Sequence, residues 1–462
     1  MSTERVQKQI FGTNGVRGVI GKDMTPDLVM RIGKALGTMR KGRIAVGRDT
    51  RTSGEALAAA VSAGLMATGC EVVDCGVLPT PALQYLIMEH FDGGAMITAS
   101  HNPPEYNGVK VIEPDGTEMG DEETLKLEEI LFSGAFDEVS WEEVGSKKDA
   151  PDLKEEYIDA IVSHFPPGIG AGMTVVVDPG SGPAADTTPA ILSRLGCTVH
   201  TINAQKDGRF PGRLPEPSPE GLAPLAELVV ETGAAFGVAH DGDADRAVFV
   251  DNQGRYVEEN REFALVGSYV CRKTKGRVVT PVSTSLIAEK IAAMHGCTVE
   301  YTPVGSIYVA RRMRELLGEG KEVAFGGEGN GGLIYPDHQF CRDGGMTAAM
   351  MAGLLQTEGK SLSALLDALP TYHIIKEKVK TQEADTVIAA LKERYAGEKI
   401  DCRDGIRINR PGSWALVRPS GTEPMMRVVV EAEIRENGEG FFREIMTVIR
   451  AAAPDLTHTR II

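Results

Sequence analysis

A short sequence repeat occurs three times along the chain and predicts its fold class. The copy at residues 42–72 begins GRIAVGRDT and ends ATGCEV, the copy at 172–199 begins GMTVVVDPGSG and ends GCTV, and the copy at 276–299 begins GRVVTPVSTS and ends HGCTV. Each copy predicts a strand rich in β-branched residues, a loop, an amphipathic helix that ends at a glycine, and a second buried strand. Strand–helix–strand units of this length are typical of parallel strand pairs joined by a right-handed crossover. The repeat therefore predicts an α/β protein.

The repeat also indicates how the chain is divided. At 462 residues the chain is too long for a single hydrophobic core. Polar or turn-forming stretches separate the copies, and the last segment changes to long strand-like runs such as WALVRPSG with two amphipathic helices. We expect three consecutive similar α/β domains with mixed sheets at 1–150, 151–251 and 252–370, followed by a smaller α+β domain at 371–462.

The net charge limits the kind of ligand. The chain carries 65 acidic and 49 basic residues, a formal charge of −16, which argues against binding nucleic acid. An anionic small molecule would need arginines and lysines gathered in one place. No apolar run approaches the roughly 20 residues that span a bilayer. The first residues, MSTERVQKQIFGTNG, lack the apolar core of a signal peptide, so we expect a cytoplasmic protein without a membrane partner.

The cysteines point to the same compartment. Seven cysteines, an odd number, are scattered widely and do not form a disulfide framework. Cys70, Cys197 and Cys297 occupy equivalent positions in the three repeats, just after each predicted helix. We therefore expect them to be small buried apolar residues and not metal ligands or nucleophiles.

The first candidate site is the loop TASHNPP at residues 98–104. It follows the strand-like run GGAMIT, and its two prolines bar the chain from continuing as helix or sheet. Ser100, at the end of a buried strand and next to His101, is well placed to act as a nucleophile or phosphate carrier. Lys110 lies on the next predicted strand, within reach of the same loop. The alternative is a polar turn held by a side-chain hydrogen bond.

The second candidate site is the loop DGDADR, with carboxylates at Asp241, Asp243 and Asp245. Alternate carboxylates along a tight turn can converge on one hard cation. A calcium EF-hand would need glycine and glutamate where Arg246 and Asn252 stand, and the flanking runs are strand-like, so calcium is excluded. Three carboxylates leave positions open on an octahedral Mg²⁺. A solvated acidic turn is the alternative, which the apolar flanks make less attractive.

The third candidate site is the glycine-rich loop GGEGNGG at residues 326–332. It contains the G-x-G-x-x-G pattern of dinucleotide sites, but LIYPDHQF follows it where a helix is required, so a nucleotide cofactor is rejected. Glycines around Glu328 and Asn330 suggest a backbone close to a polyol, with these side chains hydrogen-bonded to hydroxyl groups. A plain glycine-rich turn is the alternative.

The fourth candidate site is the loop RPSGTEP at residues 418–424, with Arg427 just beyond it. Hydroxyl groups, consecutive backbone N–H groups and the guanidinium of Arg418 together form a phosphate-binding nest, whereas a plain hairpin loop is the alternative.

Two smaller basic clusters lie earlier in the chain. Arg17 could meet a transferring phosphoryl group, and Arg48 and Arg51 are as well explained as structural ion-pair partners.

Together, the four loops resemble one known family. The sequences TASHNPPEYNGVK, DGDADR, GGEGNGG and RPSGTEP, in this order, closely resemble the α-D-phosphohexomutase superfamily, and the resemblance extends over essentially the whole chain. It is greatest to the archaeal-type branch of phosphoglucosamine mutases and phosphomannomutases/phosphoglucomutases. The resemblance implies a magnesium-dependent isomerase, an intramolecular phosphotransferase, with four domains around a central cleft that contribute one loop each.

The resemblance also implies a role for each loop. Ser100 would be the phosphoserine, and its phosphate would bind one Mg²⁺ together with Asp241, Asp243 and Asp245. Glu328 and Asn330 would bind the sugar hydroxyls. The residues implied to hold the substrate's non-reacting phosphate are Arg418, Ser420, Gly421, Thr422 and Arg427. Those implied to surround the transferring phosphoryl group are Arg17, His101, Lys110 and Arg246.

One position departs from the family pattern. Many members end the sugar loop with a histidine, as in GExSxH, where this chain has Gly332, and Asn330 replaces the serine. The acid/base role of that histidine therefore cannot be transferred. His101 and Lys110 become the better candidates, and His338 is a distant one. The change also weakens any inference about the preferred sugar.

The expected reaction passes through a sugar bisphosphate. Phospho-Ser100 would phosphorylate a hexose phosphate, and the bisphosphate would then return its other phosphate to the serine. We expect interconversion of glucosamine 6-phosphate and glucosamine 1-phosphate, with mannose and glucose phosphates as alternatives. A sugar phosphatase that uses phosphoserine and a non-catalytic sugar-phosphate binding protein are the rivals. We expect the C-terminal domain to close over the bound phosphate as a lid. We also expect a homodimer formed through the first domain.

Overall fold

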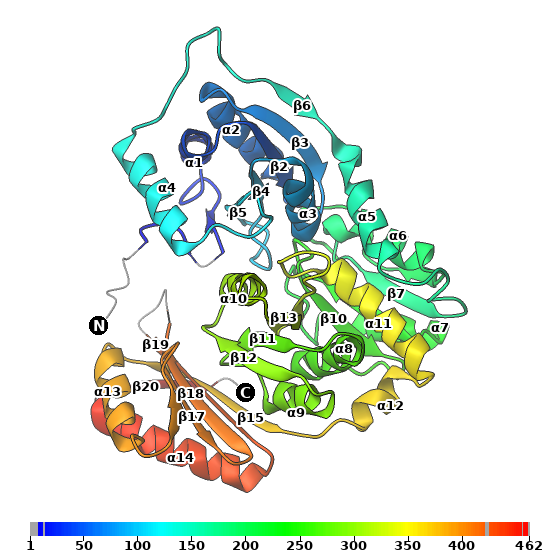
Figure 1. The fold of residues 1–462 in the computed structure, drawn as a ribbon, viewed down its shortest axis with the longest axis vertical. Coiled ribbons are helices and arrows are strands. Elements are labelled where there is room, and N and C mark those ends of the chain that lie inside the picture. Colours follow the sequence, from blue (N-terminus) through cyan, green and yellow to red (C-terminus); the bar gives the residue numbers. More distant parts are fainter. Residues whose placement is uncertain (1–7, 13, 421–424, 455, 461–462) are drawn as a thin grey trace. The chain divides into compact units, whose positions relative to one another are not determined.

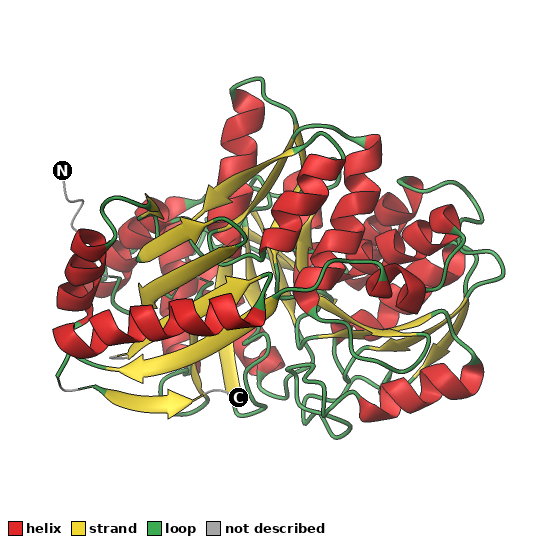
Figure 2. Ribbon diagram, turned by 90° about the horizontal axis from the view of Figure 1, so that it is seen from below, coloured by secondary structure: helices red, strands yellow, loops and turns green. Residues whose placement is uncertain are grey.

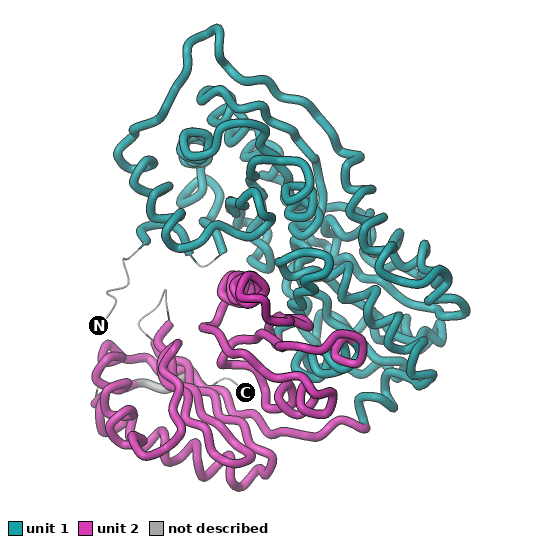
Figure 3. The backbone as a smooth tube through the Cα atoms, in the orientation of Figure 1, with its two compact units in different colours: residues 1–269, 330–367 teal, residues 270–329, 368–462 magenta. Residues whose placement is uncertain are grey.

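The computed structural model describes residues 8–12, 14–420, 425–454 and 456–460. The chain forms two compact units, coloured separately in Figure 3. The first unit comprises residues 1–269 and 330–367, and the second comprises residues 270–329 and 368–462. Helices and strands alternate along most of the chain and pack as layers (Figure 2).

The first sheet of the first unit positions the serine loop. Its strands are β1 (Val16–Val19), β2 (Arg43–Arg48), β3 (Glu71–Val77), β4 (Gly94–Ile97), β5 (Tyr106–Ile112) and β6 (Lys147–Asp149), in the order β1-β5-β4-β2-β3-β6 (Figure 1). Its helices are α1 (Pro26–Met39), α2 (Gly54–Ala67), α3 (Thr80–His90) and α4 (Asp121–Ser133). β2 pairs in parallel with β3 and β4, whereas β5 pairs antiparallel with β4 and β1, so the sheet is mixed.

The second sheet positions the aspartate loop. Its strands are β7 (Thr174–Asp178), β8 (Thr198–Thr201), β9 (Phe236–His240) and β10 (Ala247–Asp251), in the order β10-β9-β7-β8. β7 is parallel to β8 and β9, and β9 and β10 are antiparallel. Its helical segments are η1 (Pro151–Leu153), α5 (Lys154–Ser163), η2 (Pro183–Asp186), α6 (Thr188–Arg194) and α7 (Ala223–Thr232). Helix α8 (Glu259–Lys273) begins in this unit and ends in the second. The chain later returns to this unit with β14 (Gly332–Ile334), α11 (Gly344–Glu358) and α12 (Leu362–Asp367).

The second unit contains two further sheets. The strands β11 (Arg277–Pro281), β12 (Thr298–Thr302) and β13 (Val323–Glu328) pair in parallel, with helices α9 (Leu286–Met294) and α10 (Ser306–Gly318). The C-terminal sheet is antiparallel, in the order β16-β17-β18-β19-β15-β20. Its strands are β15 (His373–Lys380), β16 (Lys399–Asp401), β17 (Ile406–Arg410), β18 (Ser413–Pro419), β19 (Met425–Ala432) and β20 (Thr457–Arg460).

The two faces of the C-terminal sheet are covered differently. Helices α13 (Ala384–Arg394) and α14 (Arg435–Ala452) share one hydrophobic core with residues of β18 and β19 such as Val417 and Val428. On the other face, Trp414 and Leu416 pack with Val282. Because successive residues of a strand point to opposite faces, this alternation follows from the sequence of β18.

The predicted repeat and fold class are confirmed. The three copies form the parallel pairs β2–β3, β7–β8 and β11–β12, each joined through a helix, and the C-terminal region is an antiparallel sheet with two helices. Cys70, Cys197 and Cys297 are buried as expected, and all seven cysteines are free thiols. The described part of the chain contains no helix that is both long and apolar enough to cross a membrane. The exact domain boundaries stay a prediction.

Candidate active site

Ser100 lies buried just beyond β4, in an unusual backbone conformation. Its φ of 49° falls in the left-handed region, which residues other than glycine seldom adopt. Its backbone N–H donates to the Thr98 hydroxyl at 2.9 Å, and its own hydroxyl donates to Oδ2 of Asp241 at 2.9 Å. Ser100 is only 1 % exposed. The loop therefore aims the serine hydroxyl directly at the aspartate loop.

Arg51 holds the serine loop in this conformation. Its buried guanidinium donates to four backbone carbonyl oxygens of the loop, those of Ser100, Asn102, Pro103 and Tyr106. Its Nε donates to Asp49 at 3.1 Å, and Asp49 also accepts a hydrogen bond from the Thr98 hydroxyl at 2.6 Å. The ion-pair interpretation of Arg51 is therefore supported, and the pair has the further effect of fixing the path of the loop.

The aspartate loop joins β9 to β10 and approaches the serine loop through a glycine. A Cβ atom at Gly242 would lie 2.3 Å from the carbonyl oxygen of Ser100, so a larger residue would push the two loops apart. Carboxylate oxygens of Asp241, Asp243 and Asp245 lie within 4.8 Å of one another, and all three residues are buried. Three carboxylates at this spacing offer the oxygen ligands that a small divalent cation prefers.

The hydrogen bonds of this triad leave ligand positions open. Oδ2 of Asp243 accepts hydrogen bonds from the Thr80 hydroxyl at 2.6 Å and from Nζ of Lys110 at 2.8 Å. Oδ2 of Asp245 accepts from Nη2 of Arg342 at 2.5 Å and from Lys110 at 3.3 Å. The Oδ1 atoms of both aspartates are buried and have no hydrogen-bond partner among the described residues. Buried carboxylate oxygens without partners are costly, so the donor set fits a bound Mg²⁺.

The charges of the triad and Lys110 are strongly linked. Burial works to lower the pKa of Lys110, but Asp243, Asp245 and Glu118 outweigh it and hold that pKa above its ordinary value. Lys110 is therefore a permanent cation at neutral pH, which suits charge neutralisation better than proton abstraction. Burial raises the pKa of Asp241 to about 7, against the opposing effect of Arg246. A divalent cation would favour its ionised form.

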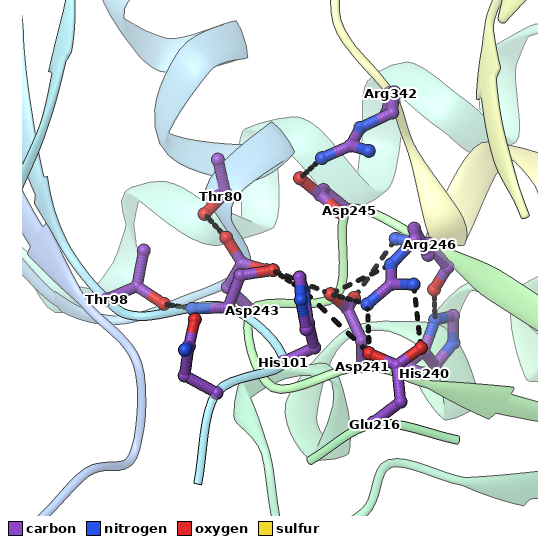
Figure 4. A network of polar contacts seen from close by, with 12 residues as sticks. Thr80, Thr98, His101, Glu216, His240, Asp241, Asp243, Asp245, Arg246 and Arg342 are labelled. Atoms are coloured by element: carbon purple, nitrogen blue, oxygen red, sulfur yellow. Dashed lines mark hydrogen bonds and ion pairs between the residues drawn. The ribbon is translucent and has the colours of Figure 1, made fainter. Parts of the chain in front are cut away.

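Arg246 and His101 lie beside the aspartate loop (Figure 4), and His101 also lies close to Ser100. Arg246 donates two hydrogen bonds to the carboxylate of Glu216, at 3.1 and 3.0 Å, and a third to Asp241 at 3.2 Å. Nδ1 of His101 lies 3.4 Å from the Ser100 hydroxyl and 3.8 Å from Glu216. Burial and the charge of Arg246 lower the pKa of His101, so its ring is neutral at pH 7 and can accept a proton.

Arg17 reaches the serine loop from the first strand. It lies on β1 opposite Gly108 of β5, and its Nη1 donates to Oδ1 of Asn102 at 3.1 Å. The structure therefore brings most of the proposed transfer site together within the first unit. The residues gathered there are Ser100, His101, Lys110, Arg17, Arg246, Asp241, Asp243 and Asp245.

Three residues of this site were not singled out from the sequence. Thr80 at the start of α3, Glu216 in the segment before α7, and Arg342 before α11 all contact the aspartate loop or Arg246. Each comes from a segment far from the loop in sequence. The one local signal is a helix start beside two of them. Thr80 is followed by Pro81 in the first turn of α3, and Arg342 precedes Asp343, the N-cap of α11.

The two predicted sugar-binding residues belong to different compact units. Glu328, the last residue of β13, is buried in the second unit, and the neighbouring carbonyl of Gly327 accepts a hydrogen bond from the Thr280 hydroxyl at 2.9 Å. Asn330 begins the returning segment of the first unit. His338 stacks on Tyr85 with ring centroids 5.0 Å apart, and its Nε2 lies 3.5 Å from Asp343, the N-cap of α11. These contacts give His338 a part in packing.

The phosphate loop follows β18 in the second unit. Arg418 on β18 lies directly opposite Arg427 on β19, and Arg427 in turn lies opposite Lys378 on β15. Opposite residues of an antiparallel pair share a face, so three basic side chains form one row across the sheet. Nε of Arg418 lies 3.2 Å from Asp404, and the N–H of Ser420 donates to the carbonyl of Met425 at 2.8 Å. Gly421 and Thr422 lie outside the described residues.

Comparisons with known proteins identify the family. Four family models match consecutive parts of the chain, described as domains I, II and III (alpha/beta/alpha) and the C-terminal domain of phosphoglucomutase/phosphomannomutase. They match residues 8–138, 155–254, 258–372 and 375–448. Together they cover nearly the whole chain.

Individual relatives match over nearly their full length. The chain is 43% identical over 447 residues to a phosphoglucomutase/phosphomannomutase of Thermococcus kodakarensis, covering 94% of this chain and 96% of the relative. It is 42% identical over 455 residues to a probable phosphoglucosamine mutase of Methanopyrus kandleri, covering 96% and 99%. A crystal structure of a phosphoglucomutase/phosphomannomutase family protein from Burkholderia thailandensis superimposes with a TM-score of 0.86 at 26% identity, covering 96% and 97%. The chain therefore belongs to the phosphoglucomutase/phosphomannomutase family, within the α-D-phosphohexomutase superfamily.

Proposed function

We propose that the protein is a Mg²⁺-dependent phosphohexomutase that interconverts glucosamine 6-phosphate and glucosamine 1-phosphate through a phosphoserine at Ser100. The observation that carries the proposal is the 2.9 Å hydrogen bond from the Ser100 hydroxyl to Asp241, within a buried triad of carboxylates. A serine that merely closes a polar turn does not need a left-handed backbone, a four-carbonyl arginine clamp and three acidic neighbours.

The metal site would consist of Asp241, Asp243, Asp245 and the phosphate on Ser100. When bound there, Mg²⁺ supplies positive charge to the phosphoryl oxygens. The unpartnered Oδ1 atoms of Asp243 and Asp245 support this assignment. Lys110 and Arg246 hold the other oxygens of the triad and add two further cationic side chains beside the serine.

Each phosphoryl transfer exchanges one P–O bond for another. In the forward half, the bond from phosphorus to Ser100 Oγ breaks as a hydroxyl oxygen of the hexose phosphate bonds to phosphorus, which leaves a hexose bisphosphate. The proton of that hydroxyl needs an acceptor, and the departing Oγ of Ser100 needs a proton. His101, with a neutral ring 3.4 Å from Ser100 Oγ, is our candidate for taking up the first proton and returning it to the serine, while Lys110 and Arg17 act as cations.

The second half regenerates the phosphoserine. The bisphosphate turns over, its other phosphate is transferred to Ser100, and the isomerised monophosphate leaves. We therefore expect a hexose bisphosphate to activate dephosphorylated protein. Water has to be excluded meanwhile, because hydrolysis of the phosphoserine would convert the mutase into a phosphatase.

The non-reacting phosphate would bind to the C-terminal loop. We assign this role to Arg418, Ser420, Gly421, Thr422 and Arg427. The direct opposition of Arg418 and Arg427 supports the assignment, because like charges at this position disfavour each other unless an anion lies between them. Glu328 and Asn330 would bind the sugar hydroxyls, and closure of the C-terminal domain over the phosphate would exclude water.

Relatives give two answers on the sugar. The name of the Methanopyrus kandleri relative supports glucosamine phosphate, and that of the Thermococcus kodakarensis relative supports the alternative of mannose and glucose phosphates. The test is a competition assay with phosphorylated protein, Mg²⁺ and the 1-phosphates of glucosamine, mannose and glucose. We expect the highest kcat/KM for glucosamine phosphate. Release of inorganic phosphate at the rate of isomerisation would instead indicate a phosphatase, and turnover without phosphoserine would contradict the mechanism.

We also propose that the protein forms a homodimer through its first domain, and that it is located in the cytoplasm. Trp141, which is 84 % exposed, and the exposed Phe132 and Val144 support a contact surface around the segment between α4 and β6. The seven free thiols support a reducing compartment. Sedimentation velocity of the wild type and of Trp141→Ala tests the dimer. A wild-type monomer at micromolar concentration would contradict it.

A further inference from the structure

Arg342 reaches the aspartate loop from a segment that is firmly anchored. It follows β14 and precedes Asp343, whose backbone N–H donates to the carbonyl of Leu333 at 3.0 Å and whose side chain caps α11 through Met346. From there its Nη2 reaches Oδ2 of Asp245 at 2.5 Å, and the side chains of both residues are nearly buried, at 9 % and 3 % exposure. Figure 4 shows Arg342 meeting Asp245 from a different side than Arg246 approaches Asp241.

The stem of Arg342 occupies the space that a side chain at position 332 would need. A Cβ atom at Gly332 would lie 2.3 Å from Cδ and 3.0 Å from Cγ of Arg342. The φ of Gly332 lies outside the left-handed region, so the backbone does not require glycine there. The requirement is for space. A side chain at 332 and Arg342 in its present position exclude each other.

Arg342 also decides which oxygen of Asp245 is free. Arg342 and Lys110 both bond Oδ2, and Oδ1 is left buried without a hydrogen-bond partner among the described residues. Nζ of Lys110 lies 2.8 Å from Asp243 and 3.3 Å from Asp245, whereas Nη2 of Arg342 lies 2.5 Å from Asp245. Arg342 is therefore the closer donor to Asp245. Without the arginine, the carboxylate would be held by the longer bond alone and could rotate about its last torsion.

We propose that Arg342 is a positioning residue that turns Oδ1 of Asp245 toward the cation site, and that Gly332 is a glycine because it makes room for Arg342. The two residues form a matched pair, which takes up the position where many relatives carry a histidine. The inference rests on the metal site of the proposed function. It assigns to the pair a role in the affinity for the divalent ion, and no direct contact with the sugar.

The test measures metal binding without sugar, by titrating the protein with Mn²⁺ and following free Mn²⁺ by electron paramagnetic resonance. Loss of a group that orients a metal ligand typically weakens metal affinity about 10- to 100-fold, and we expect this range for Arg342→Gln. Arg342→Lys keeps the charge and should lose less. Gly332→Ala should weaken binding similarly, because its methyl group displaces the arginine stem. Arg194→Gln, which removes surface pairs with Glu155 and Asp159, is the matched control and should bind as the wild type does.

The double variant Gly332→Ala/Arg342→Gln decides whether the two residues act together. If they do, the double variant binds no more weakly than the worse of the two single variants. In turnover, Arg342→Gln should need more Mg²⁺ for half-activation, while KM for the sugar phosphate at saturating Mg²⁺ changes little. Binding of Mn²⁺ by Arg342→Gln within about twofold of the wild type, or losses that multiply in the double variant, would overturn the proposal.

The two proposals fail in different ways. If the wild type binds Mn²⁺ through the triad but isomerises no hexose phosphate, the proposed function fails and the assignment of Arg342 stands. If the wild type binds no Mn²⁺, the assignment of Arg342 fails. If Arg342→Gln does not fold, as judged by circular dichroism, Arg342→Lys and Gly332→Ala carry the same test. Unchanged metal affinity in both would then refute the proposal.

Discussion

The serine–aspartate cluster of the first unit and the row of basic residues in the second unit are both proposed to bind phosphate, yet they are built in opposite ways. In the cluster, Ser100, Lys110 and the three aspartates are almost fully buried, and each charged group is held by donors from several segments. In the row, Arg427 is exposed, and Arg418, whose side chain is 21 % exposed, pairs with Asp404. Breaking a buried charge pair is strongly destabilising, whereas exposed pairs contribute little.

This difference shows whether the charged groups of each region are positioned before the substrate binds. The cluster is organised before any substrate arrives, because uncompensated charges inside the fold would destabilise it. That suits a site where charge has to be neutralised during bond exchange. Arg427, the exposed member of the row, keeps its charge hydrated and gives up that hydration only when an anion binds. Mutations of the buried charged residues should therefore affect stability and chemistry together in the cluster, whereas mutations of the exposed Arg427 should affect substrate affinity alone.

The largest effect is expected from Ser100→Ala. Loss of the proposed phosphate carrier should reduce kcat by about 10⁴- to 10⁶-fold, as loss of a covalent nucleophile does in other enzymes. The melting temperature should change little, since the alanine keeps the backbone clamp of Arg51. A steady-state assay with a sugar bisphosphate present measures this. Substantial residual turnover would show that another group carries the phosphoryl group.

Lys110→Met should have the largest effect on stability. Removing the shared cation leaves Asp243 and Asp245 facing each other in the interior, which we expect to lower the free energy of unfolding by about 3–5 kcal/mol. Added Mg²⁺ should restore part of this loss. Arg427→Met, at the exposed position of the basic row, is the counterpart and should cost at most about 1 kcal/mol. Denaturant unfolding with and without Mg²⁺ measures both; equal losses would contradict the comparison.

Arg51→Met tests whether Arg51 holds the serine loop in its conformation. The variant removes one donor from each of four carbonyl oxygens and the cation that pairs with Asp49, and we expect a loss of about 3 kcal/mol in unfolding free energy. The turnover of the folded fraction should fall as well, because Ser100 depends on this clamp for its left-handed backbone. Arg48→Met, which breaks a weaker pair with Asp74 at 3.4 Å, is the control. If both variants behave alike, the clamp has no special role.

The smallest effect is expected from Lys378→Gln in the basic row. Lys378 stands one strand beyond Arg427, so its charge should contribute modestly to phosphate binding. We expect KM for the hexose phosphate to rise by a factor of about 3 to 10, which corresponds to roughly 1 kcal/mol. The value of kcat and the melting temperature should stay unchanged. A change in kcat without a change in KM would remove Lys378 from the phosphate site.

Much of this architecture was predictable because its signals are local. The Gly-Cys-x-Val ends of the repeats indicate where each helix stops and the next strand begins, and the alternating aspartates of DGDADR share one short turn. Glu216 carries no such signal, and the helix start beside Arg342 does not reveal which residue the arginine contacts. Arg342 reaches Asp245 across 97 positions of sequence and Glu216 reaches Arg246 across 30, so only the fold brings them together.

Lys378, the third member of the basic row, was hidden for a different reason. Lys378, Arg427 and Arg418 share a face only in the register that the strands adopt, and a slip of one residue would turn a strand's side chains to the other face. Gly332 is a similar case. Its departure from the family pattern was visible in the sequence, but its explanation, the stem of Arg342, required coordinates.

The central claim is that one divalent ion joins the side chain at position 100 to the carboxylates at 241, 243 and 245. Anomalous diffraction from a crystal of phosphorylated protein grown with Mn²⁺ locates that ion directly. We predict a single strong peak bonded to one oxygen of each aspartate and to an oxygen of the phosphate on the serine. A peak elsewhere, or an empty triad with Lys110 still bridging Asp243 and Asp245 in crystals that turn over substrate, would contradict the account.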